Sequence, residues 1–332
     1  MKPFFKWSGG KRKEIKRVLK HMPSSYDTYY EPFLGGGAIW LHLEPEKSVV
    51  NDNYPDVINF LSVLKSDPIK LSKDIENLSL CYNKEVNELP QNTELEDDVA
   101  KRKEELKHLK KKAELSKLSD ELNNGPDDEY KLKKAELSKL SDELKRDFQK
   151  IAEKYYYKYR NSNYDSAHEQ AIQFYILRQL SFSGMLRFSS SGNFNIPFGW
   201  YKSLKKIEEN IPDIKRVLGN TTLLNGDWYD AVKTASKDDF VFLDPPYTRK
   251  FTKYHPNGEF LQKEHEKLAE WFRGTTTQAM IIINKDEFTG NLYGDYIKEE
   301  YGHKYSIQYR DRMKEADSNA VHMLATNYDI EK

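Results

Sequence analysis

Short apolar runs alternate with amphipathic segments along most of the chain. Five short runs have the composition of strands that a parallel sheet buries, and they are residues 28–32, 48–52, 221–224, 240–243 and 280–283. Helical spacing of apolar positions begins at Ala38 and recurs at residues 58–64 and 263–272. Residues 305–309 and 321–328 have the pattern of a closing β-hairpin. This alternation predicts a doubly wound α/β domain, in which ligands bind at the carboxyl ends of the strands.

The alternation is interrupted at about residues 94–150, where Lys, Glu and Leu dominate. Residues 111–122 recur unchanged as residues 133–144, and each copy carries three leucines at helical spacing: Leu115, Leu118 and Leu122, then Leu137, Leu140 and Leu144. An Asn-Asn-Gly-Pro-Asp-Asp turn separates the copies. The pattern predicts an antiparallel, charged helical hairpin. A solvated surface insertion is the favoured interpretation, and a contact with a partner protein or with DNA is the alternative.

Charge and composition restrict the class of protein. The 332 residues include 53 basic and 53 acidic side chains, and a net charge of zero excludes a uniformly basic, nucleic-acid-binding surface. The sum is uneven, because the first 30 residues are locally basic while the insertion is nearly neutral. One cysteine, Cys81, and a mean hydropathy of -0.85 predict no internal disulfide and no membrane-spanning stretch. The N-terminus also lacks the pattern of a secretory signal, so a cytoplasmic location is expected.

A glycine-rich turn follows the first predicted strand. It reads Glu-Pro-Phe-Leu-Gly-Gly-Gly at residues 31–37, and consecutive glycines let a backbone approach a ligand and turn into a helix. Asp52 ends the next strand, 17 positions after Gly35. An acidic residue at about that separation commonly accepts hydrogen bonds from a ribose. Together these features predict a cofactor that contains adenosine.

A second motif, Asp-Pro-Pro-Tyr at residues 244–247, follows the strand at 240–243. The two prolines have no N–H groups, so the turn presents carbonyls and the Asp244 carboxylate as an acceptor-rich edge. This edge suits an amino group such as the exocyclic amine of adenine, whose lone pair is delocalised into its ring. Accepting the amine's protons would direct that lone pair at an electrophile, and Tyr247 would provide a face for an extruded base.

These motifs, in their order, resemble those of the Dam-type adenine-N6 DNA methyltransferases, the D12 class with alpha-group motif order, which use S-adenosylmethionine. The resemblance rests on five blocks, at residues 5–11, 31–37, 51–53, 225–228 and 244–247. It covers residues 1–65 and about 170–330, and it leaves out the charged insertion. The resemblance implies a Rossmann-like methyltransferase sheet at residues 1–60 and 220–332, and a helical target-recognition domain at residues 61–219 that contains the insertion.

The resemblance also implies site residues. The catalytic motif is Asp244, Pro245, Pro246 and Tyr247, and the S-adenosylmethionine site comprises Trp7, Lys11, Glu31, Phe33, Gly35, Gly37, Asp52, Asp227 and Trp228. In this scheme Lys11 contacts a polar part of the cofactor, Asp52 holds the ribose hydroxyls, and Trp228 covers the adenine. A methyl group on a sulfonium is already activated, so no metal is expected, and the eight histidines show no clustering along the sequence.

The implied partner is double-stranded DNA, recognised by residues similar to the recognition-hairpin region of Dam-type enzymes. They are Phe182, Ser183, Arg187, Asn195 and Pro197. Arg187 resembles the guanine-reading arginine of enzymes that methylate the adenine in GATC, and arginine pairs bidentately with guanine in the major groove. Its alternative role is to bind a phosphate or to support the structure. The chain departs from the family where Phe182 and Ser183 replace a typical Tyr-Asn and where Trp200 replaces a basic residue.

Three other functions compete with adenine methylation. Cytosine-N4 methylation poses the same chemical problem, although Asp244 favours adenine. A nicotinamide-dependent oxidoreductase would use the glycine turn and Asp52 but leaves the Asp-Pro-Pro-Tyr motif without a role. A non-catalytic binding protein would depend on the insertion, and no obligate protein partner is evident otherwise. The sequence leaves open a restriction-associated, a solitary or a viral role.

Overall fold

The computed structural model describes residues 1–88, 146, 149–189, 192–247, 260–304 and 319–329, so the repeats of the predicted insertion lie outside the described residues. The strands are β1 (Tyr29–Glu31), β2 (Ser48–Asp52), β3 (Thr221–Asn225), β4 (Phe240–Leu243), β5 (Gln278–Asn284), β6 (Ile297–Lys304) and β7 (Asn319–Thr326). The α-helices are α1 (Ile15–His21), α2 (Ala38–Leu43), α3 (Pro55–Ser66), α4 (Pro68–Glu88), α7 (Ala167–Leu180), α8 (Ile211–Gly219), α9 (Trp228–Val232), α10 (Gln262–Gly274) and α11 (Glu287–Tyr293). Residues 149–160 are also helical, and short 3₁₀ turns include η1 (Lys11–Lys13), η2 (Phe182–Gly184) and η3 (Gly294–Tyr296).

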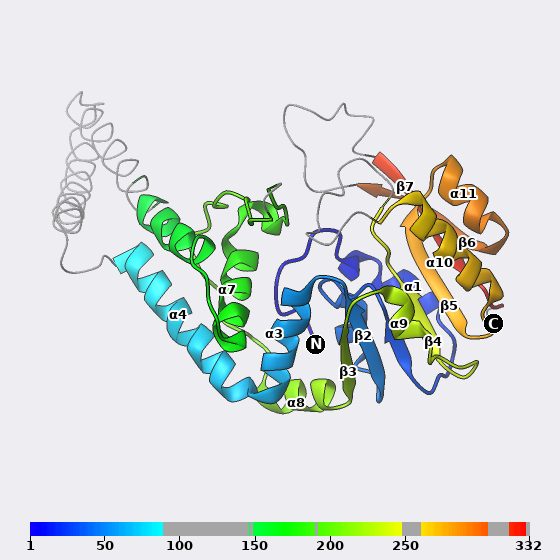
Figure 1. The fold of residues 1–332 in the computed structure, drawn as a ribbon, viewed down its shortest axis with the longest axis horizontal. Helices are drawn as coiled ribbons and strands as arrows, with labels where there is room; N and C mark the ends of the chain where they lie inside the picture. The colour runs from blue at the N-terminus through cyan, green and yellow to red at the C-terminus, as the bar shows by residue number, and fades with distance from the viewer. Residues whose placement is uncertain (89–145, 147–148, 190–191, 248–259, 305–318, 330–332) are drawn as a thin grey trace, which may run out of the picture.

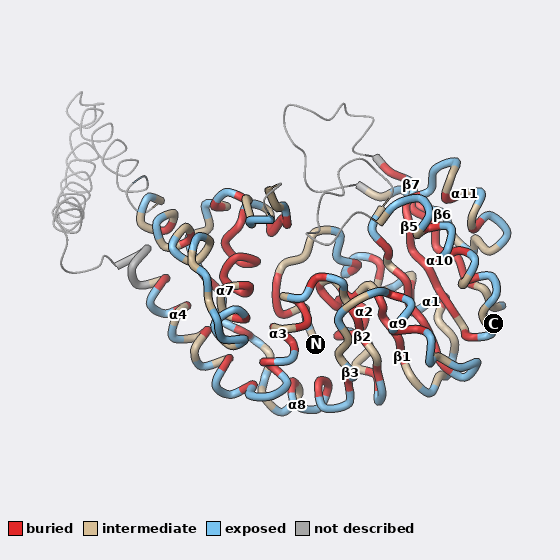
Figure 2. The backbone as a smooth tube through the Cα atoms, viewed as in Figure 1, coloured by how far each residue is buried: buried red, intermediate tan, exposed pale blue. Residues whose placement is uncertain are grey.

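The strands form one mixed sheet in the order β3-β2-β1-β4-β5-β7-β6 (Figure 1). The first five of these pair in parallel, and β7 runs antiparallel to both β5 and β6. The apolar runs of β4 and β5 are buried on both faces, as parallel strands beneath covering helices must be (Figure 2). The predicted α/β methyltransferase fold is confirmed.

Alternate residues of each strand build two separate hydrophobic clusters. Phe240 and Phe242 of β4 join a cluster with α1, α2 and α3, whereas Val241 and Leu243 join a second cluster with α9 and α10. The side-chain period of a strand is two, so this division places helices on both faces of the sheet. The sheet is therefore the central layer of a three-layer arrangement.

Helix α3 joins the sheet to a second group of helices, which includes α4, α7 and residues 149–160 (Figure 1). Phe60 of α3 lies 5.4 Å from Phe5 of the N-terminal segment and 5.8 Å from Tyr175 of α7, between ring centroids. These rings belong to one continuous buried cluster with the sheet. The assignment of residues 61–219 to a target-recognition domain stays a prediction.

The C-terminal hairpin differs from the sequence expectation. The strand expected at residues 321–328 is β7, but its partner is β6 at Ile297–Lys304, and residues 305–309 lie outside the described residues. The sequence of β6 is Ile-Lys-Glu-Glu-Tyr-Gly-His-Lys, which is polar because β6 is the edge strand of the sheet. Among the described residues, no helix combines the length and the apolar composition needed to cross a membrane.

Candidate active site

Four sequence motifs meet at one edge of the sheet because they follow adjacent parallel strands. The glycine turn follows β1, Asp52 ends β2, Asp227 follows β3 and Asp244 follows β4. The carboxyl ends of parallel strands share one edge, and the chain order reverses between β1 and β4. Such a switch point is the usual ligand site of an open α/β sheet.

The glycine turn packs against Trp7. Gly35 and Gly37 have φ of 52° and 62°, in the left-handed region that favours glycine. A Cβ on Gly35 would lie 2.5 Å from Trp7 Nε1, and one on Gly36 would lie 2.8 Å from Trp7 Cβ. The missing side chains therefore allow the N-terminal block to lie directly on the turn, which brings two of the predicted cofactor blocks together.

Asp52 holds the ends of two loops. Its Oδ2 accepts a hydrogen bond from the Gly35 N–H at 2.7 Å, and its Oδ1 accepts one from the Tyr54 N–H at 2.8 Å. Burial raises the pKa of Asp52 to about 6, and these two backbone hydrogen bonds oppose the rise. Asp52 thus fixes the glycine turn, while its role toward a ribose stays a prediction.

Glu31 lies inside the protein beneath the turn and is 3% exposed. Its Oε2 accepts hydrogen bonds from the Tyr29 hydroxyl at 2.7 Å and from the Trp40 N–H at 3.0 Å. Burial raises the pKa of Glu31 to about 8, so the carboxyl is largely protonated at neutral pH. The observed contacts are those of a group that ties β1 to the start of α2.

Aromatic rings flank the ends of β1 and β3. Phe33 and Trp228 lie 6.4 Å apart between ring centroids with 26° between their planes, and Phe260 meets Phe33 edge-on. Asp227 is exposed and caps α9 by accepting a hydrogen bond from the Tyr229 N–H at 2.8 Å. The preceding Gly226 N–H lies 3.3 Å from the Asp52 carbonyl oxygen. The Phe33 and Trp228 rings therefore form an apolar wall at this edge, and Asp227 stands at the start of the helix that carries Trp228.

Lys11 connects the N-terminal block to the Asp-Pro-Pro-Tyr motif. Its Nζ lies 2.6 Å from Asp244 Oδ1 and donates a 2.9 Å hydrogen bond to the Tyr247 hydroxyl. Lys11 is 5% exposed and Asp244 is 21% exposed. Burial raises the pKa of Asp244, and the positive charge of Lys11 opposes that rise. The sequence assigned Lys11 to the cofactor, and its contact with the catalytic motif was not foreseen.

The two prolines complete this motif. Pro245 is buried and Pro246 is exposed, so the turn leaves the sheet within two residues of Asp244. Neither proline has an N–H group, and the motif offers acceptors in this turn. The structure thus brings Asp244, Lys11 and Tyr247 together at the sheet edge.

The predicted DNA-binding residues lie between residues 181 and 198, where isolated β-bridges join Ser181 to Phe198 and Phe188 to Phe194. Phe182 is 43% exposed, its N–H donates to the Pro197 carbonyl at 2.9 Å, and Ser183 has φ of 52°. Arg187 is exposed and donates from Nε to Asn195 Oδ1 at 2.8 Å. All five predicted residues are therefore neighbours on one segment.

Arg178 is a structural link that sequence reasoning missed. It is 1% exposed, and it donates hydrogen bonds to the carbonyl oxygens of Lys6, Gly184 and Met185. Burial lowers the pKa of Arg178 to about 10. The bonds join the N-terminal block to the segment that carries Arg187. An arginine within the apolar run Phe-Tyr-Ile-Leu-Arg-Gln-Leu was the available signal.

The histidines do not cluster along the sequence, but two of them come together in the fold. His303 of β6 and His322 of β7 come together with Glu14, which precedes α1. The three are far apart in the sequence, so no spacing pattern could have found them.

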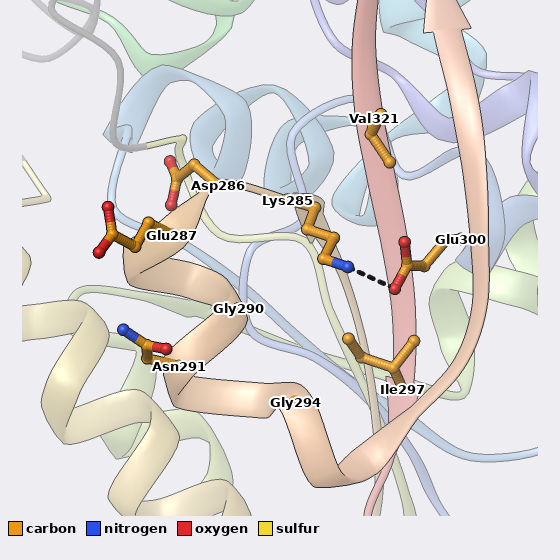
Figure 3. Close-up of a pocket in the computed structure, with 9 residues that line it drawn as sticks. All are labelled: Lys285, Asp286, Glu287, Gly290, Asn291, Gly294, Ile297, Glu300 and Val321. Atoms are coloured by element: carbon orange, nitrogen blue, oxygen red, sulfur yellow. Dashed lines mark hydrogen bonds and ion pairs between the residues drawn. The ribbon is translucent and has the colours of Figure 1, made fainter.

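A pocket of about 680 Å³ lies elsewhere, between the start of α11 and strands β6 and β7 (Figure 3). Its lining includes Asp286, Glu287 and Val321, and the Lys285 Nζ points at Glu300 Oε1 from 2.5 Å. No predicted site residue lines this pocket.

The sheet order, with its antiparallel β7, and the motifs at its carboxyl edge define a protein of the α/β methyltransferase class. The model of the D12 class N6 adenine-specific DNA methyltransferase family matches residues 7–125 and 128–313. The chain belongs to this family, so it is an enzyme that methylates adenine in DNA. Because the family is adenine-specific, the cytosine-N4 alternative is not retained.

Three relatives show how far the similarity extends. The Type II methyltransferase M.CviBI of Paramecium bursaria Chlorella virus NC1A is 27% identical over 331 residues, which cover 99% of this chain and 100% of the relative. The Type II methyltransferase M1.LlaDCHI of Lactococcus lactis subsp. cremoris is 25% identical over 99% of this chain and 96% of its own. The DNA adenine methylase of Haemophilus influenzae is 24% identical over 88% of this chain and 82% of its own.

Proposed function

We propose that the enzyme transfers a methyl group from S-adenosylmethionine to N6 of an adenine that is flipped out of duplex DNA, with GATC as the leading target. The observation that carries this proposal is the contact of Lys11 with both Asp244 and Tyr247 beside the glycine turn. It joins an amine-accepting carboxylate, an aromatic face and the N-terminal block at one edge of the sheet. DNA as substrate is consistent with action in the cytoplasm of a bacterial, phage or viral system.

The residues at the carboxyl edge fit S-adenosylmethionine. Asp52 is an acceptor beside the glycine turn, as a ribose requires, and Phe33 with Trp228 supplies an apolar wall for an adenine. Trp7 packs on the glycine turn and would form another wall of the cofactor site. When bound, the cofactor supplies a methyl group on a positively charged sulfur, and this electrophile needs no metal for activation.

Asp244 would act on the amine of the target base. Lys11 holds Oδ1, which leaves Oδ2 to accept a hydrogen bond from the adenine N6–H. The charge of Lys11 favours the ionised carboxylate against the effect of burial. The N6–C bond would form as the bond from the methyl carbon to sulfur breaks, and the ionised Asp244 carboxylate would stabilise the positive charge that develops on N6. The N6 proton would then pass to this carboxylate and on to solvent, and S-adenosylhomocysteine would leave as the second product.

Base flipping would be needed for the target amine to reach Asp244. The N6 amine of a stacked, paired adenine takes part in base pairing, so it reaches Asp244 only when the nucleotide leaves the helix. The hydrogen bond from Lys11 orients Tyr247, whose ring would stack on the extruded base. Phe182 is exposed on the segment that also carries Arg187, and its aromatic ring can occupy the space that the base vacates.

Sequence reading would fall to Arg187 with its neighbour Asn195. The Arg187 Nε bonds to Asn195 Oδ1 and its second terminal nitrogen bonds to the Asn195 carbonyl at 3.1 Å. These bonds hold the guanidinium plane at an exposed position. A preorganised guanidinium is suited to the O6 and N7 acceptors of guanine.

The cofactor is tested by thermal unfolding with S-adenosylhomocysteine or with a nicotinamide dinucleotide. We expect stabilisation by the first compound only, and a smaller shift for Asp52→Ala. Asp230→Ala is the matched control, because Asp230 is an exposed acid of α9 that pairs with Lys233. Stabilisation by the dinucleotide alone would contradict the proposed cofactor.

The target is tested by incubating unmethylated DNA with enzyme and S-adenosylmethionine and then digesting it with nucleases that methylation blocks. Protection at GATC is expected. Long-read mapping of methylated adenines after expression in a methylation-free host identifies any other target. Methylated adenines with unmodified GATC sites would overturn the GATC assignment and leave the enzyme class intact.

A further inference from the structure

Glu14, His303 and His322 form a compact cluster beside the proposed catalytic motif. One oxygen or nitrogen from each lies within 4.8 Å of the others. His303 Nδ1 is 3.1 Å from Glu14 Oε1, and the two imidazole rings stack at 4.1 Å between centroids. Glu14 is 4% exposed and His322 is 1% exposed, so the cluster is largely shielded from solvent.

We propose that this cluster binds a single divalent transition-metal ion, of which Zn²⁺ is the best match. Two imidazole nitrogens and one carboxylate oxygen are a ligand set that zinc uses with a fourth, exchangeable position. Ligand atoms around a tetrahedral zinc lie about 3.4 Å apart, given metal–ligand distances of about 2.0–2.2 Å. The separation of Glu14 from His303 already matches this spacing.

The described surroundings allow such an ion. Glu14 uses Oε2 toward Arg17, whose Nε is 3.4 Å away, and Oε1 toward His303. The metal would therefore replace the contact between Oε1 and His303 Nδ1 without displacing Arg17. The stacked rings are 6° from parallel, so they would tilt toward each other for both nitrogens to face one ion.

The position of the site gives it a structural role. Glu14 follows η1, which contains Lys11. In the β6 and β7 ladder His303 pairs with Ala320 and His322 pairs with Tyr301, so the two histidines are diagonal neighbours on adjacent strands. The ring of Tyr247 meets His322 at 5.4 Å between centroids. A bound ion would therefore fasten the segment that contacts Asp244 to the C-terminal hairpin.

Metal binding is tested by titrating Zn²⁺ into the full-length protein in competition with a metallochromic chelator. The experiment uses a Cys81→Ser background, because the exposed thiol of Cys81 would also bind zinc. The variants are His303→Gln and Glu14→Gln. The matched control is His168→Gln, because His168 also pairs with a carboxylate, Asp74 at 2.9 Å, but belongs to α7.

We expect one equivalent of Zn²⁺ to bind to the parent and to His168→Gln. Either cluster variant should weaken binding more than about 100-fold, since losing even an outer-shell partner costs about 10–100-fold. Circular dichroism checks that each variant folds. If one of the two cluster variants does not fold, the zinc affinity of the other tests the proposal. No stoichiometric binding by the parent, or equal binding by a folded cluster variant, would overturn the proposal. The readout is metal binding, so the result is independent of the cofactor and the DNA target.

Discussion

Substituting Gly35 by alanine probes the packing that joins the N-terminal block to the glycine turn. Gly35 has φ of 52°, and a left-handed residue with a Cβ costs about 1–2 kcal/mol. The added Cβ would also lie 2.5 Å from Trp7 Nε1, and overpacking of this kind costs about 1–3 kcal/mol. Gly35→Ala should therefore reduce the free energy of unfolding by about 2–5 kcal/mol.

The two contributions can be separated by urea unfolding followed by circular dichroism. Gly192 has φ of 80° with nothing within 4 Å of an added Cβ, so Gly192→Ala reports the backbone cost alone, about 1–2 kcal/mol. In a Trp7→Ala background the clash disappears, and Gly35→Ala should then cost only as much as Gly192→Ala. The double-mutant cycle should thus give a coupling of about 1–3 kcal/mol between Gly35 and Trp7.

Two results would refute this reasoning. If Gly35→Ala costs no more than Gly192→Ala, the indole does not lie on the turn. If the cost persists unchanged in the Trp7→Ala background, the strain comes from another neighbour.

Three further predictions concern charge. Glu31→Gln should reduce the pH dependence of the free energy of unfolding. The pKa of the Glu31 carboxyl rises from 4.5 to about 8 on folding, so this group contributes up to about 5 kcal/mol of stability that is lost as the pH rises between those values. Urea unfolding at pH 5 and pH 8 checks this, and an equal change in the free energy of unfolding for the parent and the variant would contradict it. In single-turnover kinetics, Lys11→Met should move the loss of the methylation rate at acidic pH to a higher pH, since the charge of Lys11 lowers the pKa of Asp244. An unchanged pH profile of the rate would show that Lys11 does not keep Asp244 ionised. Arg187→Ala should cost about 1–3 kcal/mol at the guanine position; an unchanged preference profile would reassign Arg187 to structure.

Much of the sheet could be predicted because its strands are buried on both faces. The bounds predicted for β2 and β4 match the structure, and β5 extends beyond the apolar run at residues 280–283. The alternation also predicted ligand binding at the carboxyl ends of the strands, and Asp52 at the end of β2 and Asp244 after β4 both lie at that edge of the sheet. The polar strand β6 escaped detection, since an edge strand carries no continuous apolar run.

The contacts between distant segments could not be predicted from periodicity. Lys11 and Asp244 are 233 positions apart, and neither position carries a local pattern that names its partner. The same holds for Glu14 with His303 and His322. The buried Arg178 was visible as a charge within an apolar helix, but the carbonyl groups that it contacts come from two other segments.

The central claim is that Asp244 directs methylation of adenine N6, and nucleoside mass spectrometry of treated DNA tests it most directly. DNA is incubated with S-adenosylmethionine and the parent enzyme, Asp244→Ala or the control Asp230→Ala. We expect N6-methyladenine from the parent and the control, and none from Asp244→Ala, which should still be stabilised by S-adenosylhomocysteine. Near-normal N6-methyladenine formation by Asp244→Ala would contradict it.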